Sequence, residues 1–393
     1  MLIVTEYHNL EELKTVSDVW NRLWSQTPDS SFLHSYEAFE ATCALTGLRD
    51  DLKVLMVSLM GKPIGFVPFV IRPMETSLGT LRVLTFPMEE WFSFYNTIGP
   101  HKTIILQAAI KHLKKSDRNW DYLDWTGLLK QGREKERLET AGILHGMKME
   151  QHSSRECSVI NLEKGWYSFW TNADAEMRQT AHSMERRLQG MGRLRLMRCR
   201  SIAENQVDEP GENLIYQHLQ KILSENLANP IGKTKERRGT RNSEFISRIH
   251  NAAVGQAVAD WSVLYVDDEP IAAAYGLAHQ GRLEMLSLSS RVGWPMESRL
   301  VLMKMLLEDS CRRGDLNIMI PTTWGSVATC LRNETFTTCR FVCTPMTSWK
   351  VHALKTTRIV QEWLGKPKEP VGFYDEKWND RRDERPLKLN VLA

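Results

Sequence analysis

The sequence has no paired cysteine motif and almost no net charge. Its seven cysteines are odd in number and scattered, without a CxxC pair or a histidine partner at zinc-finger spacing. Lys and Arg total 51 against 48 Asp and Glu, a net charge of +3, so no overall field attracts nucleic acid or an anionic membrane. We expect reduced thiols in a cytoplasmic protein, no metal site, and a basic site only where cationic residues cluster locally.

Long hydrophobic runs and several well-known motifs are also missing. The most apolar stretch, 54–71, is interrupted by Gly61-Lys62-Pro63, which is typical of a turn between two strands rather than of a membrane span. The N-terminal residues lack the basic and apolar regions of a signal peptide, so export is not expected. No GxSxG, GxxxxGK[ST], HExxH or GxGxxG motif occurs, which argues against serine hydrolases, P-loop NTPases, zincins and Rossmann dehydrogenases.

The chain does contain an approximate internal repeat. Each copy has two apolar runs joined by a turn, which predicts a β-hairpin, and then a helical segment and a short strand. The segments are 54–69, 103–115 and 122–125 in the first copy, and 263–275, 299–313 and 316–320 in the second. The repeat predicts an α+β fold made of two similar domains.

A basic helix is predicted to join the two copies. The stretch 177–200 carries seven arginines and one glutamate, and Gly190-Met191-Gly192 predicts the helix end. A second basic segment, 233–241, is predicted to be a loop. Such charge runs are usually a solvated face, and an anionic partner is the alternative. We expect an N-terminal domain over 1–160, a C-terminal domain over 161–365 that includes the joining helix at about 167–191, and an irregular tail over 366–393.

The order of several short features resembles that of a known family. The features are Trp20 and Leu23 before Ser31-Phe32 and an aromatic helix to Phe39; Ile64 to Pro68 in the first hairpin; the Arg178 to Leu188 helix ending in glycine; Pro270 to Ala273 in the second hairpin; and Trp294-Pro295 before a helix ending at Arg313-Gly314. Over about 15–350 the chain is similar to double-domain GNAT-type acyltransferases related to the cellulose-biosynthesis acetyltransferase family, themselves similar to Fem peptidyltransferases. The resemblance implies two tandem GNAT-like domains, each a mixed twisted sheet flanked by helices.

The resemblance also implies a site for acyl-coenzyme A. In GNAT domains this substrate lies between two splayed parallel strands, and its pyrophosphate rests on N–H groups ahead of the following helix. A helix N-terminus offers unpaired donors and a partial positive charge to a phosphate. Here Gly293 would permit close approach, and Arg291 and Arg299 would add charge. The residues predicted to bind acetyl-CoA or a longer acyl-CoA are Ser287, Ser289, Arg291, Val292, Gly293, Met296, Ser298 and Arg299.

Acyl transfer to an amine needs a base, a donor that polarises the thioester carbonyl, and correct positioning. Glu284, on the predicted strand before the loop, is the first candidate for the base, and His250 is the second. A lone strand glutamate is more often a surface residue, and a lone histidine more often packs or caps. The sequence thus predicts an N-acyltransferase whose acceptor, a small molecule, saccharide or peptide, lies in the cleft between the domains.

Two other functions stay open at this point. A Fem-like aminoacyl or peptidyl transferase would hold the acidic backbone of a charged tRNA on the arginines between Arg178 and Arg200. A non-catalytic binding protein would keep the fold without the chemistry. This second alternative is favoured by the segment 318–325, which lacks the acidic residue and the Tyr-Lys pair that relatives commonly show.

Overall fold

The computed structural model describes residues 1–76, 78–87, 97–116, 118–203, 206–207, 211–228, 233–321, 324, 326–345, 348–353 and 356. Its strands are β1 Leu2–Tyr7, β2 Leu52–Leu59, β3 Lys62–Met74, β4 Leu81–Thr85, β5 Tyr122–Leu129, β6 Glu150–Asn161, β7 Leu194–Ala203, β8 Gln206–Val207, β9 Ala259–Val266, β10 Glu269–His279, β11 Arg282–Ser290, β12 Asn317–Ile320 and β13 Glu334–Cys343. They form a 13-stranded mixed sheet in the order β1-β2-β3-β4-β5-β13-β6-β12-β11-β10-β9-β7-β8.

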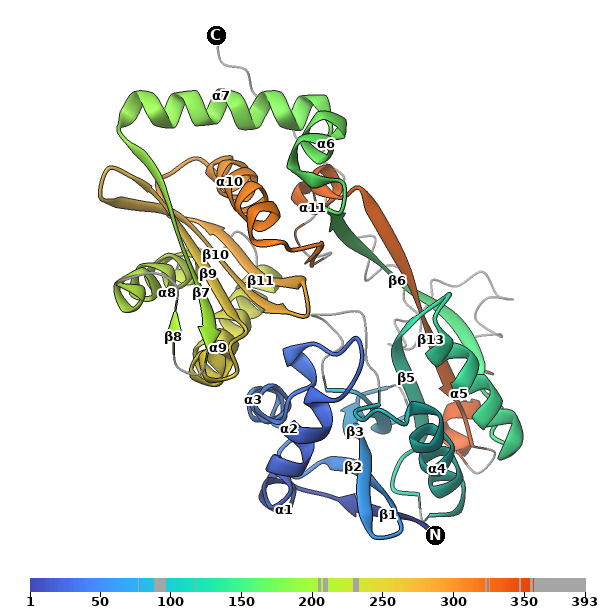
Figure 1. Ribbon diagram of the computed structural model, residues 1–393. Coiled ribbons are helices and arrows are strands. Elements are labelled where there is room, and N and C mark those ends of the chain that lie inside the picture. Colours follow the sequence, from blue (N-terminus) through green and yellow to red (C-terminus); the bar gives the residue numbers. More distant parts are fainter. Residues whose placement is uncertain are drawn as a thin grey trace.

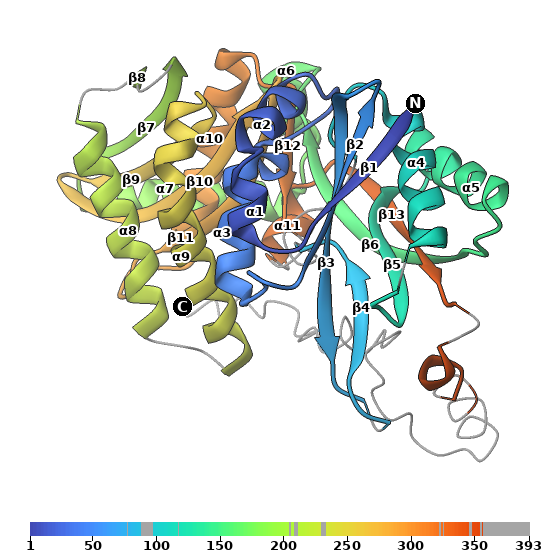
Figure 2. The same ribbon diagram turned by 90° about the horizontal axis from the view of Figure 1, so that it is seen from below.

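Helices cover the sheet in two groups (Figure 1). They are α1 Leu10–Lys14, α2 Ser17–Ser25, η1 Phe32–His34, α3 Tyr36–Thr46, α4 Lys102–Lys115, α5 Arg133–Leu144, α6 Gly165–Asn172, α7 Ala175–Met191, α8 Glu212–Ala228, α9 Lys233–Gly255, α10 Ser298–Arg313 and α11 Ser326–Leu331. We call α1–α5 with β1–β5 the first lobe, and α6–α11 with β7–β12 the second lobe. Helix α3 of the first lobe packs against α9 of the second (Figure 2).

The predicted repeat is present. Each lobe has an antiparallel hairpin, β2–β3 or β9–β10, and a third strand that pairs in parallel with the strand following a helix. In the first lobe the parallel pair is β4–β5 around α4, and in the second it is β11–β12 around α10. The predicted α+β fold made of two similar halves is therefore confirmed.

Strands β6 and β13 join the two lobes and run between them (Figure 1). Strand β6 pairs with β12 on one side and β13 on the other, while β13 also pairs with β5 of the first lobe. Strand β13, near the C-terminal end of the described chain, thus extends the part of the sheet that the N-terminal segments form. The predicted domain boundary between residues 160 and 161 falls at the end of β6. It stays a prediction, because β13 follows the boundary in the sequence but pairs with β5 of the first lobe.

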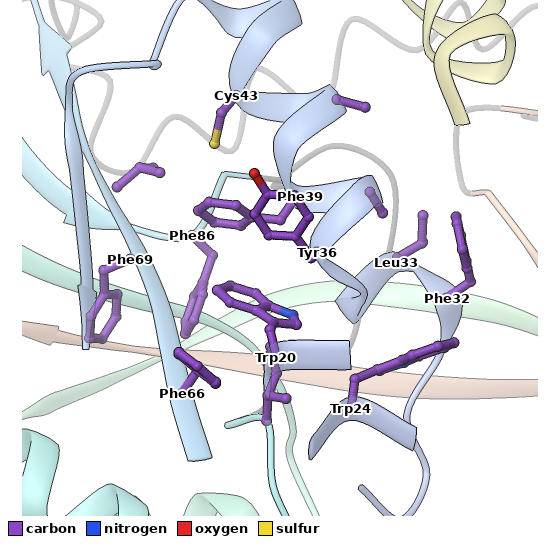
Figure 3. Packing of buried hydrophobic residues seen from close by; sticks show 14 of the residues in the cluster. Trp20, Trp24, Phe32, Leu33, Tyr36, Phe39, Cys43, Phe66, Phe69 and Phe86 are labelled. Atoms are coloured by element: carbon purple, nitrogen blue, oxygen red, sulfur yellow. The ribbon is translucent and has the colours of Figure 1, made fainter. Parts of the chain in front are cut away.

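A large aromatic core fixes the segment between α2 and α3 (Figure 3). The Trp20 ring stacks on Phe66 of β3 with centroids 4.9 Å apart. The indole N–H of Trp20 donates to the carbonyl of His34 at 2.8 Å, and that of Trp24 donates to the carbonyl of Ser31 at 2.7 Å. Buried tryptophans that also satisfy backbone carbonyls hold a loop rigidly, so these contacts set the position of Ser31.

Two sequence predictions for helices were wrong. The helix expected over 167–191 is two helices, because Asp174 is an N-cap whose side chain accepts from the N–H of Met177 at 2.8 Å and starts α7 anew. The segment 233–241, expected as a loop, opens α9. The apolar residues that anchor α9, Phe245, Ile246 and Ile249, lie beyond the basic segment, so its own pattern did not show the helix.

Other expectations concern membranes, metals and the tail. Among the helices that the structure describes, none is long and apolar enough to cross a membrane. The described residues also contain no group of three or more His, Cys, Asp or Glu side chains arranged for a metal ion. All seven cysteines are free thiols. The tail predicted over 366–393 lies outside the described residues.

Candidate functional site

The pairing of β11 with β12 stops well before the carboxyl end of β11. The parallel pairing joins Arg282 to Asn317, Leu283 to Ile318 and Glu284 to Met319, and no further pair follows in these two strands. Strand β11 nevertheless continues to Ser290, still paired with β10 on its other side. Pairing with β12 therefore stops at Glu284, one residue before β12 itself ends at Ile320, while β11 runs on and leads directly into the loop before α10.

The loop before α10 exposes backbone at its glycine. Gly293 has φ +88°, and a Cβ built there would meet no atom within 4 Å. The N–H groups of Val292, Gly293, Met296 and Glu297 form no hydrogen bond within the described chain. Those of Ser298 and Arg299 donate to the carbonyls of Pro295 and Met296, at 3.1 and 3.2 Å. The free donors thus lie in the loop itself rather than in the first residues of α10.

One polar side chain of the α10 N-terminus lacks a partner. Ser298 is 0% exposed, and its Oγ has no hydrogen-bond partner in the described structure. Glu297, the N-cap, makes no capping bond with its side chain. A buried hydroxyl without a partner is costly unless a ligand or water satisfies it. The α10 N-terminus therefore has unused donor capacity.

The two arginines predicted at the loop are not equally available. Arg291 pairs with Glu269 at 2.7 Å and with Glu225 at 3.4 Å, so its charge is balanced within the protein. The same Glu269 oxygen accepts from the indole N–H of Trp294 at 3.3 Å. Arg299 donates from Nε to the carbonyl of Met296 at 3.0 Å. Arg299 is thus the cation of this loop that retains charge for an anion.

A β-bulge brings the predicted polar residues of β11 to one face. The register with β10 shifts between Tyr275 and Gly276. Without this shift, Glu284 and Ser287 would point to opposite faces, because side chains alternate along a strand. Across the pair, Glu284 lies opposite Leu277, Ser287 opposite Tyr275 and Ser289 opposite Ala273. These three β10 residues belong to one core cluster, so Glu284, Ser287 and Ser289 share its face.

Glu284 is a buried carboxyl at the contact between the lobes. It is 5% exposed, and its Oε2 has no hydrogen-bond partner among the described residues. Burial raises the pKa of Glu284 to about 7, against the opposing effects of a hydrogen bond from Ser31 and of the Arg282 charge. A carboxyl with this pKa can both accept and release a proton near neutral pH.

His250 belongs to a different cluster. Its ring stacks on Tyr216 with centroids 3.6 Å apart, and its Nδ1 lies 3.2 Å from the hydroxyl of Tyr275. Burial lowers the pKa of His250 to about 4, so the imidazole is neutral and a weak base at neutral pH. No contact described in the structure joins His250 to Glu284, and the chemistry favours Glu284 of the two candidates.

The first lobe contributes residues that the sequence analysis did not assign to the site. Ser31 lies close enough to Glu284 to lower the pKa of its carboxyl, Asp29 lies 3.9 Å from Arg282, and the ring of Trp24 stacks on that of His279 at 5.4 Å. All three contacts meet the turn between β10 and β11 and the start of β11. The sequence carried no signal for them, because they join residues far apart along the chain.

The arginines proposed for an anionic partner divide into two sets. Arg198 and Arg200 are held by Asp260 and Asp315 in a buried network, with Arg198 Nη2 2.9 Å from Asp260 and Arg200 Nη2 2.7 Å from Asp315. The exposed arginines of this stretch are Arg186, Arg187, Arg193 and Arg195, at the end of α7 and the start of β7. Arg178, half-buried on α7, belongs to neither set, and the exposed arginines are the ones available to a partner.

Comparisons with known proteins agree with this architecture. Residues 175–318 match the family model described as an acetyltransferase (GNAT) domain. The structure of FemX is similar with a TM-score of 0.54 and 9% sequence identity, covering 86% of this chain and 98% of FemX. A conserved protein of unknown function from Bacteroides thetaiotaomicron has a TM-score of 0.54 and 11% identity, covering 87% of this chain and 100% of its own. No curated protein sequence matches.

Residues 175–318 thus match a GNAT acetyltransferase domain, and the chain as a whole has a double-domain fold similar to that of FemX. The matched segment runs from the start of α7 into β12 and therefore contains β11, the α10 loop and Glu284. At these identities the solved structures show the fold alone. The link to cellulose biosynthesis stays a prediction.

Proposed function

We propose that the protein is an acyltransferase that moves an acyl group from acyl-coenzyme A to an amine or hydroxyl acceptor. The observation that carries the proposal is the end of β11–β12 pairing at Glu284, from where β11 continues to the backbone donors around Gly293 that no hydrogen bond within the described chain uses. The pantetheine arm would lie along β11 near Ser287 and Ser289, and the pyrophosphate at the loop before α10. The seven free thiols suit a reducing compartment, as proposed for the cytoplasm.

In this proposal Glu284 is the general base. Its carboxylate takes a proton from the acceptor nitrogen or oxygen as that atom attacks the thioester carbonyl. A new C–N or C–O bond then forms, the C–S bond breaks, and coenzyme A leaves as the thiol after protonation. Since Oε2 of Glu284 is covered by protein atoms, the acceptor must displace neighbouring side chains when it binds. The acceptor site would therefore lie at the contact between the lobes.

The test of this function is release of free coenzyme A thiol from acetyl-CoA and longer acyl-CoAs, with a panel of amines, saccharides and peptides as acceptors. Turnover that depends on both substrates and is lost in Glu284→Gln supports the proposal. Turnover that Glu284→Gln leaves unchanged would remove Glu284 from the mechanism. Absence of turnover with every acyl-CoA, despite binding, would favour the non-catalytic alternative.

A Fem-like transferase using a charged tRNA is the second candidate. It is favoured by the exposed arginines Arg186, Arg187 and Arg193 and by the fold shared with FemX. Binding of tRNA through phosphate contacts weakens steeply with salt. A gel shift with tRNA that appears at low ionic strength and disappears in Arg186→Ala/Arg187→Ala would support this candidate. No shift even at low ionic strength would eliminate it.

A further inference from the structure

His279 and Glu284 lie on one face of the β10–β11 hairpin. In its register, His279 is opposite Arg282 and Leu277 is opposite Glu284. Side chains two residues apart on a strand share a face, so His279 and Glu284 are diagonal neighbours about 7–8 Å apart. The intervening residue, Ala278, packs against the core cluster on the other face. Two long side chains at that separation can both reach a small molecule held between them.

Both side chains have a buried polar atom that makes no hydrogen bond to any described residue. These atoms are Nε2 of His279 and Oε2 of Glu284. A buried polar atom that is left unpaired costs free energy, which a polar ligand recovers when it binds. An unpaired atom on each of two neighbouring side chains therefore indicates a site for one ligand that carries two polar groups.

The first lobe holds the His279 ring in place. Trp24 of α2 stacks on it, with centroids 5.4 Å apart and an interplanar angle of 25°. Trp24 is itself 3% exposed, and its indole N–H donates to the carbonyl of Ser31 at 2.7 Å. Because the indole is fixed by this bond and by burial, the stack restricts rotation of the imidazole, and Nε2 keeps its direction.

The imidazole of His279 is a weaker base than the neighbouring carboxylate. Burial and the Arg282 charge lower the pKa of His279, whereas burial raises the pKa of Glu284 to about 7. His279 is therefore neutral at neutral pH. A neutral imidazole nitrogen makes an ordinary hydrogen bond with a neutral hydroxyl, whereas a carboxylate or phosphate at this place would be repelled by the charge of Glu284.

We propose that His279 selects the acceptor: its Nε2 hydrogen-bonds a neutral hydroxyl on the carbon next to the one that bears the nucleophile, while Oε2 of Glu284 takes the nucleophile's proton. The acceptor class is then an amino alcohol or a polyol, such as a saccharide unit. This inference rests on the acyltransferase function proposed above. His279 binds the acceptor and transfers no proton, so it sets the preference among acceptors and leaves the binding of acyl-CoA unchanged.

The test compares two amines as acceptors of the full chain at saturating acetyl-CoA: ethanolamine, and propylamine, in which a methyl group replaces the hydroxyl. The measured quantity is the ratio of their kcat/KM values. His279→Phe keeps a ring against Trp24 and removes the nitrogen, so the ratio should fall about three- to tenfold, the usual worth of one hydrogen bond. His279→Gln, which retains a polar side chain, should keep part of the preference.

His182→Phe is the matched control. His182 also lies against a tryptophan, Trp170, with centroids 5.7 Å apart, but it belongs to α7, away from the first lobe (Figure 1). It should keep the wild-type ratio. A purely structural role of the His279 stack predicts the opposite order, with Phe tolerated, Gln harmful, and both amines affected equally. That order, or an unchanged ratio in His279→Phe, would overturn the proposal.

The two proposals fail separately. The Nε2 resonance of His279, assigned by its loss in His279→Phe, reports binding in the absence of transfer. If ethanolamine moves this resonance more than propylamine does but no acyl-CoA supports transfer, the acyltransferase function is wrong and the site at His279 stands. If transfer occurs and depends on Glu284 while neither amine moves the resonance, the function stands and the role of His279 is wrong.

Discussion

Glu284 and Met319 are the last residues at which β11 and β12 are paired. This one register position is both the last pair between the two strands and the place of the buried acid. The proposed substrate channel and the proposed base therefore begin at the same point of the sheet. A thioester carbonyl at the start of the opening would lie beside the only candidate base that is buried at the lobe contact in the described structure.

Gly293→Val should weaken acyl-CoA binding by about tenfold or more, or roughly 1.4 kcal/mol. At φ +88° a β-branched residue is strained and forces the loop to rearrange, and its side chain would occupy the space in front of the free N–H groups. Calorimetric titration with acetyl-CoA measures the change. Gly61→Val is the control, because Gly61 also has a positive φ, +79°, and no atom within 4 Å. Equal affinities of the two variants would contradict the assigned loop.

Glu284→Gln should slow acyl transfer by on the order of a hundredfold or more, the usual cost of losing a general base. Glutamine keeps the shape and the hydrogen-bonding oxygen, so acyl-CoA affinity should stay within about twofold of wild type. Steady-state kinetics and calorimetry on the same preparation separate the two effects. A parallel loss of binding and turnover would mean that Glu284 acts by supporting the structure.

Glu284 should also make stability depend on pH. Its pKa is about 7 in the folded protein against an ordinary 4.5. Because the folded pKa is the higher one, the stabilisation is complete below pH 4.5 and is lost as the pH rises through 7. The loss is on the order of 3 kcal/mol. Glu284→Gln lacks this loss, so its stability relative to wild type should increase from pH 5 to pH 8 in denaturant unfolding. A difference that stays constant with pH would refute the assignment.

Glu269→Gln should tighten acyl-CoA binding by about two- to fivefold at low salt, with a smaller gain at high salt. The Glu269 carboxylate neutralises Arg291 at 2.7 Å, and its removal would leave that charge for a phosphate. Glu139→Gln is the control, since Glu139 is a partly exposed glutamate whose partner, Lys135, lies 3.7 Å away on α5. Weaker binding by Glu269→Gln would indicate that Glu269 holds the loop in its binding conformation.

The parts of the fold that sequence predicts well are those set by local pattern. The two hairpins, α4 and α10 lie within a few residues of their predicted bounds, because alternating apolar residues and glycine turns specify them directly. The break before α7 depended on a single capping aspartate within an apolar pattern. The start of α9 depended on packing against α3 by residues further along the helix. Both helix boundaries are therefore set by particular contacts rather than by the periodicity of the sequence.

In the candidate site, too, local sequence features could be predicted and tertiary contacts could not. The loop glycine and the strand acid are visible as residue types at the expected places in a repeat. The pairing of Arg291 with Glu269 and Glu225, and the contact of Asp29 with Arg282, are tertiary contacts between distant segments. The sequence therefore predicted Arg291 as a phosphate ligand although its charge is already balanced within the protein.

Calorimetric titration of the full-length chain with acetyl-CoA and with longer acyl-CoAs tests the central claim most directly. The account predicts measurable heat, saturation at one ligand per chain, and an upward shift of Tm that grows with ligand concentration. It also predicts that the heat is greatly reduced in Gly293→Val and retained in Gly61→Val. No heat and no thermal shift with any acyl-CoA at millimolar concentration would contradict the claim that the opening between β11 and β12 is an acyl-coenzyme A site.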